Sequence, residues 1–155
     1  MFYNLWQYDQ AKEHLQRALF ITTEIGDRKG EAAHYGSLGN VFGSLGQYDK
    51  AIEHLQNALV ITAKIGDKKG EASCYGSLGT VFKSLGQYDK AKEYLQKALV
   101  ISTEIGDRKG EATNYGDLGT VFQLLGQYKN AKKHFQRALT ISTEIGDKQI
   151  GRAHV

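Results

Sequence analysis

The chain has 155 residues, one cysteine, no proline and a net charge of +3, from 20 lysine and arginine residues against 17 aspartate and glutamate residues. A single cysteine excludes an intramolecular disulfide framework and fits a reducing compartment, and charges of both signs interleaved along the sequence offer no concentrated basic face for nucleic acid. No apolar run approaches the ~18 residues of a membrane-spanning helix, and the N-terminus lacks a signal-peptide pattern. We therefore expect a cytoplasmic protein that binds neither nucleic acid nor membrane.

The sequence repeats itself at a spacing of 40 residues. Arg28–Asp67 and Lys68–Asp107 are identical at 29 of 40 positions, and Arg108–Asp147 follows the same frame. A fixed period of roughly 20–50 residues indicates stacked repeats, each of which buries its apolar face against its neighbours. Residues 1–149 are therefore expected to form one repeat array, with a partial first unit and three full-frame units.

Each unit predicts two helices, and the chain opens on an incomplete unit. Met1–Gln7 aligns with Val41–Gln47, the tail of a first helix, and Tyr8–Ile25 has the single apolar face of a complete second helix. We expect the other first helices at 30–45, 71–85 and 111–125, and the other second helices at 48–65, 88–105 and 128–145. A glycine follows each predicted helix, as a helix-ending residue should: Gly46, Gly66, Gly86, Gly106, Gly126 and Gly146. No segment alternates with period two, so the fold class is all-α.

The last six residues, 150–155, depart from the repeat. Ile150 stands where Gly70 should recur, and the string IGRAHV is what a sequencing-library adapter encodes in one reading frame. We expect 150–155 to be a non-native tail and the array to be a piece of a longer one. The alternative is an ordinary start of another first helix, with Ile150 inserted before Gly151.

The units resemble tetratricopeptide repeats. In the second full unit the resemblance is carried by Tyr75, Leu78, Gly79, Phe82, Gly86, Tyr88, Ala91, Leu95, Ala98 and Ile101. It implies a right-handed superhelical α-solenoid of helical hairpins that binds other proteins. The usual repeat has roughly 34 residues and a proline after the second helix, which is absent here. The 40-residue unit, with LGN or LGT in the first helix and EIGD at the junction, is similar to the Pins/LGN group. Similar long repeats also occur beside signalling domains, which would make the chain a signalling adaptor.

Positions that differ between the three full units identify a possible binding surface. Residues 33/73/113, 37/77/117, 40/80/120 and 44/84/124 change between copies and fall on one narrow arc of the first helix. The resemblance implies that first helices line a concave groove, so this arc would face a bound peptide. The candidate contacts are Asn40, Ser77, Thr80, Lys83, Asp117, Thr120 and Gln123. The alternative is a solvated face that has drifted neutrally.

Two sets of recurring glycines lie inside the first helices. A glycine there costs about 1 kcal/mol relative to alanine, so Gly39 and Gly79 need a packing reason, and a bulky residue at Gly79 should disturb the packing. Gly36, Gly76 and Gly116 lie beside the variable arc. They either lower the groove wall for a ligand backbone or allow tight contact between neighbouring units.

The remaining polar residues give no enzymatic or metal site. His14, His54 and His134 share one repeat position on the outer helix, and units stack about 10 Å apart, too far for shared metal ligands. We interpret them as surface histidines. Cys74 replaces polar residues in the other units, and the groove serines have no histidine base at usable spacing. We therefore expect no catalysis, metal or cofactor.

The predicted function is a protein-interaction scaffold that binds a peptide segment. The basic pairs Arg28–Lys29, Lys68–Lys69 and Arg108–Lys109 recur at each junction and could attract an acidic peptide, or could simply be solvated. The alternative function is a structural spacer or self-assembling rod. Under either function, apolar end faces of the array would favour self-association.

Overall fold

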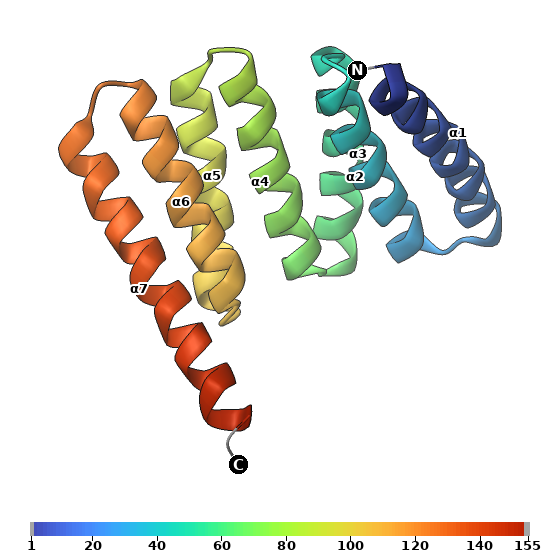
Figure 1. Ribbon diagram of the computed structural model, residues 1–155. Helices are drawn as coiled ribbons and strands as arrows, with labels where there is room; N and C mark the ends of the chain where they lie inside the picture. The colour runs from blue at the N-terminus through green and yellow to red at the C-terminus, as the bar shows by residue number, and fades with distance from the viewer. Residues whose placement is uncertain (1, 154–155) are drawn as a thin grey trace.

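The computed structural model describes residues 2–153, so Met1 and the last two residues of the expected tail lie outside the described residues. This part of the chain forms seven helices and no strands (Figure 1). The helices are α1 (Phe2–Ile25), α2 (Arg28–Ser44), α3 (Tyr48–Ile65), α4 (Lys68–Ser84), α5 (Tyr88–Glu104), α6 (Arg108–Leu124) and α7 (Tyr128–Ala153). The predicted all-α class is confirmed.

The helices stack as a solenoid with two unequal sides. Each helix packs against the next one in the chain, and the first helices also contact each other, α2 with α4 and α4 with α6. Between the second helices α3 and α5 no such contact exists in the described part of the chain. The first helices therefore form the closer-packed, concave side of the row, and in Figure 1 they lie in front of α3 and α5.

The first helices begin two or three residues earlier than predicted, because an aspartate caps each of them. The Oδ1 atom of Asp67 accepts a hydrogen bond from the backbone N–H of Gly70 at 3.0 Å, and Asp27 and Asp107 do the same in their units. Such a cap satisfies a backbone donor that the first turn of a helix leaves free. The predicted starts at 30, 71 and 111 took no account of this aspartate cap.

The helix-ending glycines are confirmed except for Gly146. Gly26, Gly46, Gly66 and the equivalent positions up to Gly126 have φ values of 71–75°, which other residues rarely adopt. At Gly146 the prediction is wrong, because α7 continues to Ala153. A Cβ atom at Gly70 would lie 2.4 Å from Oδ2 of the capping Asp67. Ile150 occupies the equivalent place after Asp147, so the same cap cannot form and no new helix starts there.

The predicted break before Tyr8 is also absent. Residues 2–25 form the single helix α1 instead of a first-helix tail followed by a second helix. Trp6 stands where Gly46, Gly86 and Gly126 turn the chain with φ of 74–75°. An L-residue with a bulky side chain is disfavoured in that conformation, so the helix runs through Trp6.

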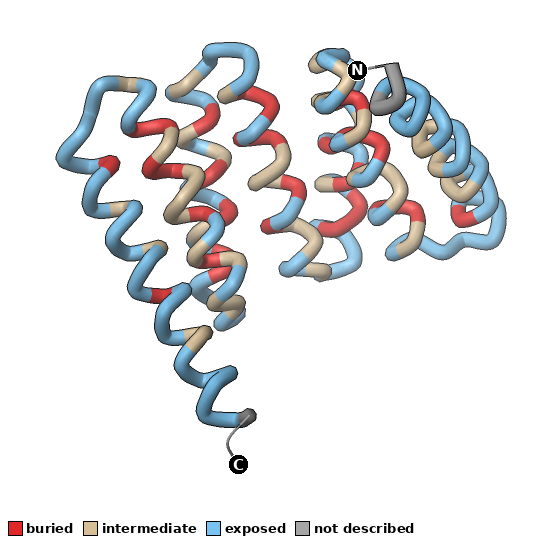
Figure 2. The backbone as a smooth tube through the Cα atoms, in the orientation of Figure 1, coloured by how far each residue is buried: buried red, intermediate tan, exposed pale blue. Residues whose placement is uncertain are grey.

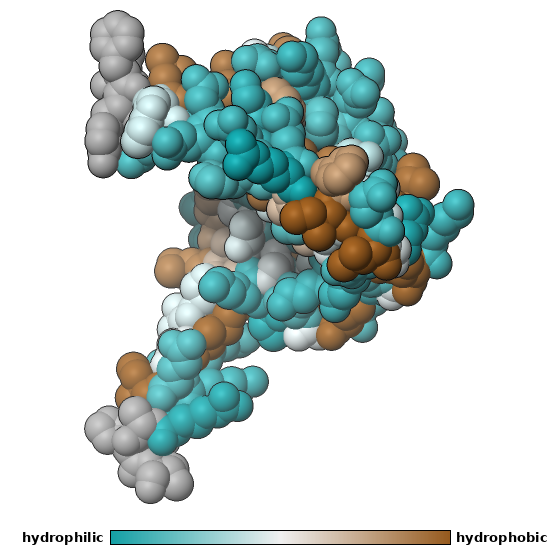
Figure 3. Space-filling model, turned by 90° about the vertical axis from the view of Figure 1, so that its right-hand side faces the viewer, coloured by the Kyte–Doolittle hydropathy of each residue, from teal (hydrophilic) through white to brown (hydrophobic). Residues whose placement is uncertain are grey.

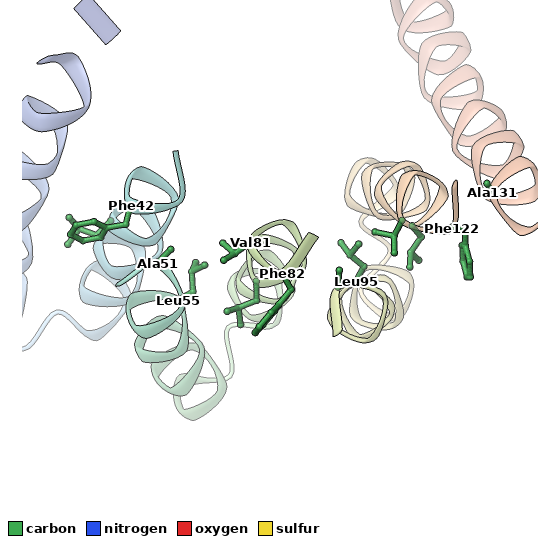
Figure 4. Packing of buried hydrophobic residues seen from close by; sticks show 13 residues of the cluster. Phe42, Ala51, Leu55, Val81, Phe82, Leu95, Phe122 and Ala131 are labelled. Atoms are coloured by element: carbon green, nitrogen blue, oxygen red, sulfur yellow. The ribbon is translucent and has the colours of Figure 1, made fainter. Parts of the chain in front are cut away.

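The core is a row of leucines between the paired helices. Leu38, Leu55, Leu78, Leu95 and Leu118 are at most 1% exposed, and each contributes about 1.5–3 kcal/mol by burial. A Cβ atom added to Gly79 would lie 2.7 Å from Leu95 Cγ and 3.3 Å from the Ala91 carbonyl oxygen. The packing role predicted for Gly79 is confirmed. In Figure 4 Val81 of α4 points toward Ala51 and Leu55 of α3, which shows how each first helix also covers the preceding second helix.

Both ends of the array leave apolar positions uncovered. On α7, Phe135 is 40% exposed, whereas the equivalent Leu95 is 1% exposed. On α1, Ile21 is 57% exposed, whereas the equivalent Ile61 is 5% exposed. Figure 2 shows the two end helices mostly exposed, and Figure 3 shows apolar side chains gathered on the face that α1 forms. These surfaces, the α1 end face and the α7 end face, are what an adjoining unit would cover.

Candidate functional site

The concave surface is hollowed between its first helices. One cavity of about 250 Å³ lies between the N-terminal halves of α2 and α4, and a second of about 340 Å³ lies between their C-terminal halves. A third and larger cavity, of about 490 Å³, lies between α4 and α6. We call this third one the α4–α6 cavity. Because the units repeat, the cavities form a series along one side of the solenoid.

The structure brings some of the predicted contact residues together and separates others. Asn40 lines both cavities between α2 and α4, Ser77 lines all three, Thr80 lines two, and Asp117 lines the α4–α6 cavity. Lys83 is half-buried beside Asp117. Two others lie apart from this group. Thr120 is half-buried and donates its hydroxyl to the Gly116 carbonyl at 3.2 Å, and Gln123 lines an apolar depression of the α7 end face.

The recurring basic pairs divide into two different environments. The first member of each pair forms an ion pair with a glutamate three residues later: Arg28 with Glu31 at 2.9 Å, Lys68 with Glu71 at 3.2 Å and Arg108 with Glu111 at 2.8 Å. The second members, Lys29, Lys69 and Lys109, are exposed, line the concave cavities and form no ion pair among the described residues. The i,i+3 spacing of the paired residues could have revealed this division from sequence.

Asp117 is the one acidic residue at its repeat position, where the other units have Ser37 and Ser77. Burial against α4 raises the pKa of its carboxyl group, and the positive charge of Lys83 lowers it by a smaller amount. No ion pair within 4.0 Å neutralises Asp117 in the part of the chain that the structure describes. The carboxylate is thus partly desolvated without a direct partner.

Sequence reasoning missed Asn114, which is 7% exposed. Its Nδ2 donates a hydrogen bond to Ser102 Oγ at 3.1 Å, but its Oδ1 accepts none from the described residues. Since no buried side-chain nitrogen or oxygen among these residues lacks a partner, Oδ1 must be open to the α4–α6 cavity that Asn114 lines. The only sign of Asn114 in the sequence was a difference between the units at its repeat position, where the others have His34 and Cys74.

The glycines beside the variable arc leave open space. A Cβ atom at Gly36 or Gly116 would have no neighbour within 4 Å, and at Gly76 it would meet only Asn114 Oδ1 at 3.7 Å. The alternative explanation, tight contact between neighbouring units, is therefore wrong. The other explanation, that these glycines leave room for a ligand backbone beside the cavities, is compatible with this geometry.

The comparison with protein families decides the identity of the repeat. The tetratricopeptide repeat profile matches residues 3–62, 31–104 and 70–144, nearly the whole chain. The chain belongs to the tetratricopeptide repeat family. No curated protein matches it in sequence.

Solved structures share the tetratricopeptide repeat fold at low sequence identity. BtubC from P. vanneervenii has a TM-score of 0.81 at 24% identity over 90% of this chain, and the TPR domain of Arabidopsis FLU has 0.69 at 23% over 73%. A Rap protein complexed with competence and sporulation factor has 0.86 at 21% over 95%. The alignments cover 58%, 95% and 41% of those chains, respectively. This tetratricopeptide repeat array therefore spans little more than half of BtubC and less than half of the Rap protein.

The histidines of this tetratricopeptide repeat array take part in packing. His14 is exposed as predicted, and His54 and His134 lie half-buried at the surface of their helices. The ring of His54 is tilted against that of Phe42, with 4.9 Å between their centroids, whereas the equivalent Tyr94 stacks flat on Phe82 at 5.2 Å. Within residues 2–153 no three acidic, histidine or cysteine side chains cluster to hold a metal ion, and no helix is long and apolar enough to cross a bilayer.

Cys74 should be an unreactive thiol. It is 6% exposed, and burial raises the pKa of the thiol to about 11. At pH 8 roughly one thiol in a thousand would then be ionised, against about a quarter for a free cysteine. We expect a thiol-specific reagent to label Cys74 at pH 8 only when the chain unfolds, so the labelling rate should follow the urea unfolding curve. Fast labelling in the absence of urea would contradict this environment.

Proposed function

We propose that the chain is a protein-interaction scaffold that binds a peptide segment on its concave surface, and that it performs no catalysis and needs no cofactor. The observation that supports the proposal is the coincidence of two features. The cavities between first helices are lined by positions that vary between otherwise near-identical repeats, such as Ser77 and Asp117. The proposed contacts remain Asn40, Ser77, Thr80, Lys83, Asp117, Thr120 and Gln123.

The chemistry of the cavities favours a bound peptide whose backbone is extended. Their walls carry hydroxyl groups, the amide of Asn40 or Asn114, and glycines without a side chain. Hydroxyl and amide groups can each donate to and accept from the N–H and C=O groups that an extended peptide leaves free. A Rap protein of similar fold is complexed with competence and sporulation factor, which is a precedent for ligand binding by such a fold.

We further propose that the chain acts as a cytoplasmic signalling adaptor and that its repeats are of the Pins/LGN-like kind.

The concave surface can be tested with peptides selected from a random library displayed on phage. Ser77 lines all three cavities, so Ser77→Arg should block them and weaken the selected peptides by at least about tenfold. Gln56 is exposed on the outer helix α3, so Gln56→Arg is the matched control and should leave affinity unchanged. Both variants should keep the helical circular dichroism and melting temperature of the parent. Peptides that all bind the Ser77→Arg variant as tightly as the parent would contradict the proposal.

A self-assembling rod is the second candidate, and the uncovered end faces favour it. On α1, Ile21 is 57% exposed although the equivalent Ile61 is 5% exposed, and on α7 Tyr128 and Leu139 are both 68% exposed. Apolar patches of this kind promote association between copies. Association that is independent of Ser77 and ends when the α7 end face is covered would support the rod.

A further inference from the structure

The α4–α6 cavity carries opposite charges at its two ends. Lys69 and Lys109 lie at the end where α4 and α6 begin, and Asp117 lies at the other end. Lys109 and Asp117 are eight residues apart on α6, which corresponds to about 12 Å along the helix axis. The neighbouring cavity between α2 and α4 has Ser77 in place of Asp117, so the charge arrangement belongs to this one cavity.

Neither end is neutralised by the protein. Lys69 and Lys109 have no ion-pair partner among the described residues, because Glu71 and Glu111 are held by Lys68 and Arg108. Asp107 lines the same end, where its carboxylate caps α6 through the Gly110 N–H at 3.0 Å, so two lysines face one carboxylate and this end keeps a net positive charge. At the other end Lys83 acts on Asp117 only from beyond ion-pair distance. A ligand with a negative group at the lysine end and a positive group at the Asp117 end would therefore gain binding free energy at both ends.

The middle of the cavity offers a place for a ligand backbone. Gly76 presents no side chain, and a Cβ atom placed there would meet only Asn114 Oδ1, at 3.7 Å. Asn114 is 93% buried, because its exposed fraction is 7%, and its Oδ1 accepts no hydrogen bond from the described residues. A peptide N–H that passes over Gly76 can donate to this oxygen. This unpartnered acceptor is independent of the charges and indicates a ligand at the same site.

We propose that the α4–α6 cavity binds an extended peptide segment with an acidic and a basic side chain about four residues apart, since an extended chain rises about 3.3 Å per residue. The acidic side chain pairs with Lys69 and Lys109, the basic side chain pairs with Asp117, and the backbone between them donates to Asn114. This inference rests on the proposed function, namely that the concave surface binds peptides.

The test uses the full chain and the peptides selected on it, with affinities measured by fluorescence anisotropy at low salt. Peptides that bind through the concave surface should be enriched in an acidic and a basic residue at this spacing. Replacing either residue with alanine should weaken binding by about tenfold. Asp117→Ser, which installs the residue of the other two units, and Lys109→Gln should each weaken binding by a similar factor, and added salt should reduce the difference.

Matched controls and a charge reversal make the result decisive. Asp89→Ser and Lys64→Gln change exposed residues outside the cavity and should leave affinity unchanged. Asp117→Lys should shift the preference to peptides with acidic residues at both positions. Peptides that depend on Ser77 but lack the charge pattern, or are indifferent to Asp117 and Lys109, would overturn this inference and leave the proposed function standing. If no peptide depends on Ser77, the proposed function and this inference both fall.

Discussion

Replacing Gly79 with alanine is expected to lower the free energy of unfolding by about 2 kcal/mol, whereas the same change at Gly76 is expected to raise it by about 0.5–1 kcal/mol. The two glycines lie three residues apart on the same helix, α4. They differ in what surrounds them, so one substitution should have opposite effects at the two positions.

The opposite signs follow from the neighbours of the added methyl group. At Gly79 it would lie 2.7 Å from Leu95 Cγ and 3.3 Å from the Ala91 carbonyl oxygen. Leu95 is 1% exposed, so it has no free space into which it could move, and α4 and α5 would have to separate. This steric cost exceeds the gain of about 1 kcal/mol in helix propensity. At Gly76 the methyl group meets only Asn114 Oδ1, at an ordinary contact distance of 3.7 Å, so the propensity gain remains.

Urea denaturation followed by circular dichroism measures both changes, with Gly36→Ala as a second open position. Gly36 has no neighbour within 4 Å of an added Cβ atom, so Gly36→Ala should stabilise the chain like Gly76→Ala. A Gly79→Ala variant at least as stable as the parent would show that α4 and α5 do not approach as closely as described. A destabilised Gly36→Ala would show that the concave surface is more crowded than described.

The sequence predicted the parts of the fold that depend on one repeat unit. The spacing of Leu78, Gly79 and Phe82 on one face of a helix can be recognised without a structure, because helical periodicity brings such residues together. Local hydrogen bonding was harder to predict. The Asp67 cap places the start of α4 at Lys68, earlier than predicted. Where Trp6 or Ile150 replaces a glycine of the repeat, the helix continues instead of ending. Each of these residues was visible in the sequence, but its effect depended on the geometry of the cap or of the turn.

The candidate site was less predictable, because its cavities lie between units. The variable arc included Ser77 and Asp117, both of which line the α4–α6 cavity. The arc did not include Lys109, which lines the cavity while the adjacent Arg108 is paired with Glu111; only the i,i+3 spacing of Arg108 and Glu111 indicates this division in the sequence. Nor could it identify Asn114, whose role arises from an oxygen that faces Gly76 on the neighbouring first helix. Contacts between residues about one repeat apart have no local pattern from which they could be inferred.

Covering the α7 end face is expected to stabilise the chain by about 3 kcal/mol, the effect of burying one or two large apolar side chains. The change replaces residues 148–155 with a copy of 68–87, so that a glycine again follows Asp147 by three residues and the aspartate can cap a new first helix. In the existing units Val81 of α4 points toward Ala51 and Leu55 of α3 (Figure 4). The equivalent residues on α7 are Ala131 and Phe135, and Phe135 is 40% exposed without such a neighbour.

The control is the same extension with serine in place of the copied Leu78 and Val81, which are 0% and 5% exposed in α4. This control can still form a helix but cannot cover Phe135 with apolar side chains, so the added stability should be lost. Urea denaturation measures the stability, and sedimentation velocity shows whether the covered chain associates less than the parent. Because an array gains stability from each interface between neighbours, equal stabilisation by both extensions would contradict the packing assigned to the α7 end face. Association that persists after this face is covered would have to arise elsewhere, and the α1 end face, where Ile21 and Ile25 are 57% and 70% exposed, would then be its site.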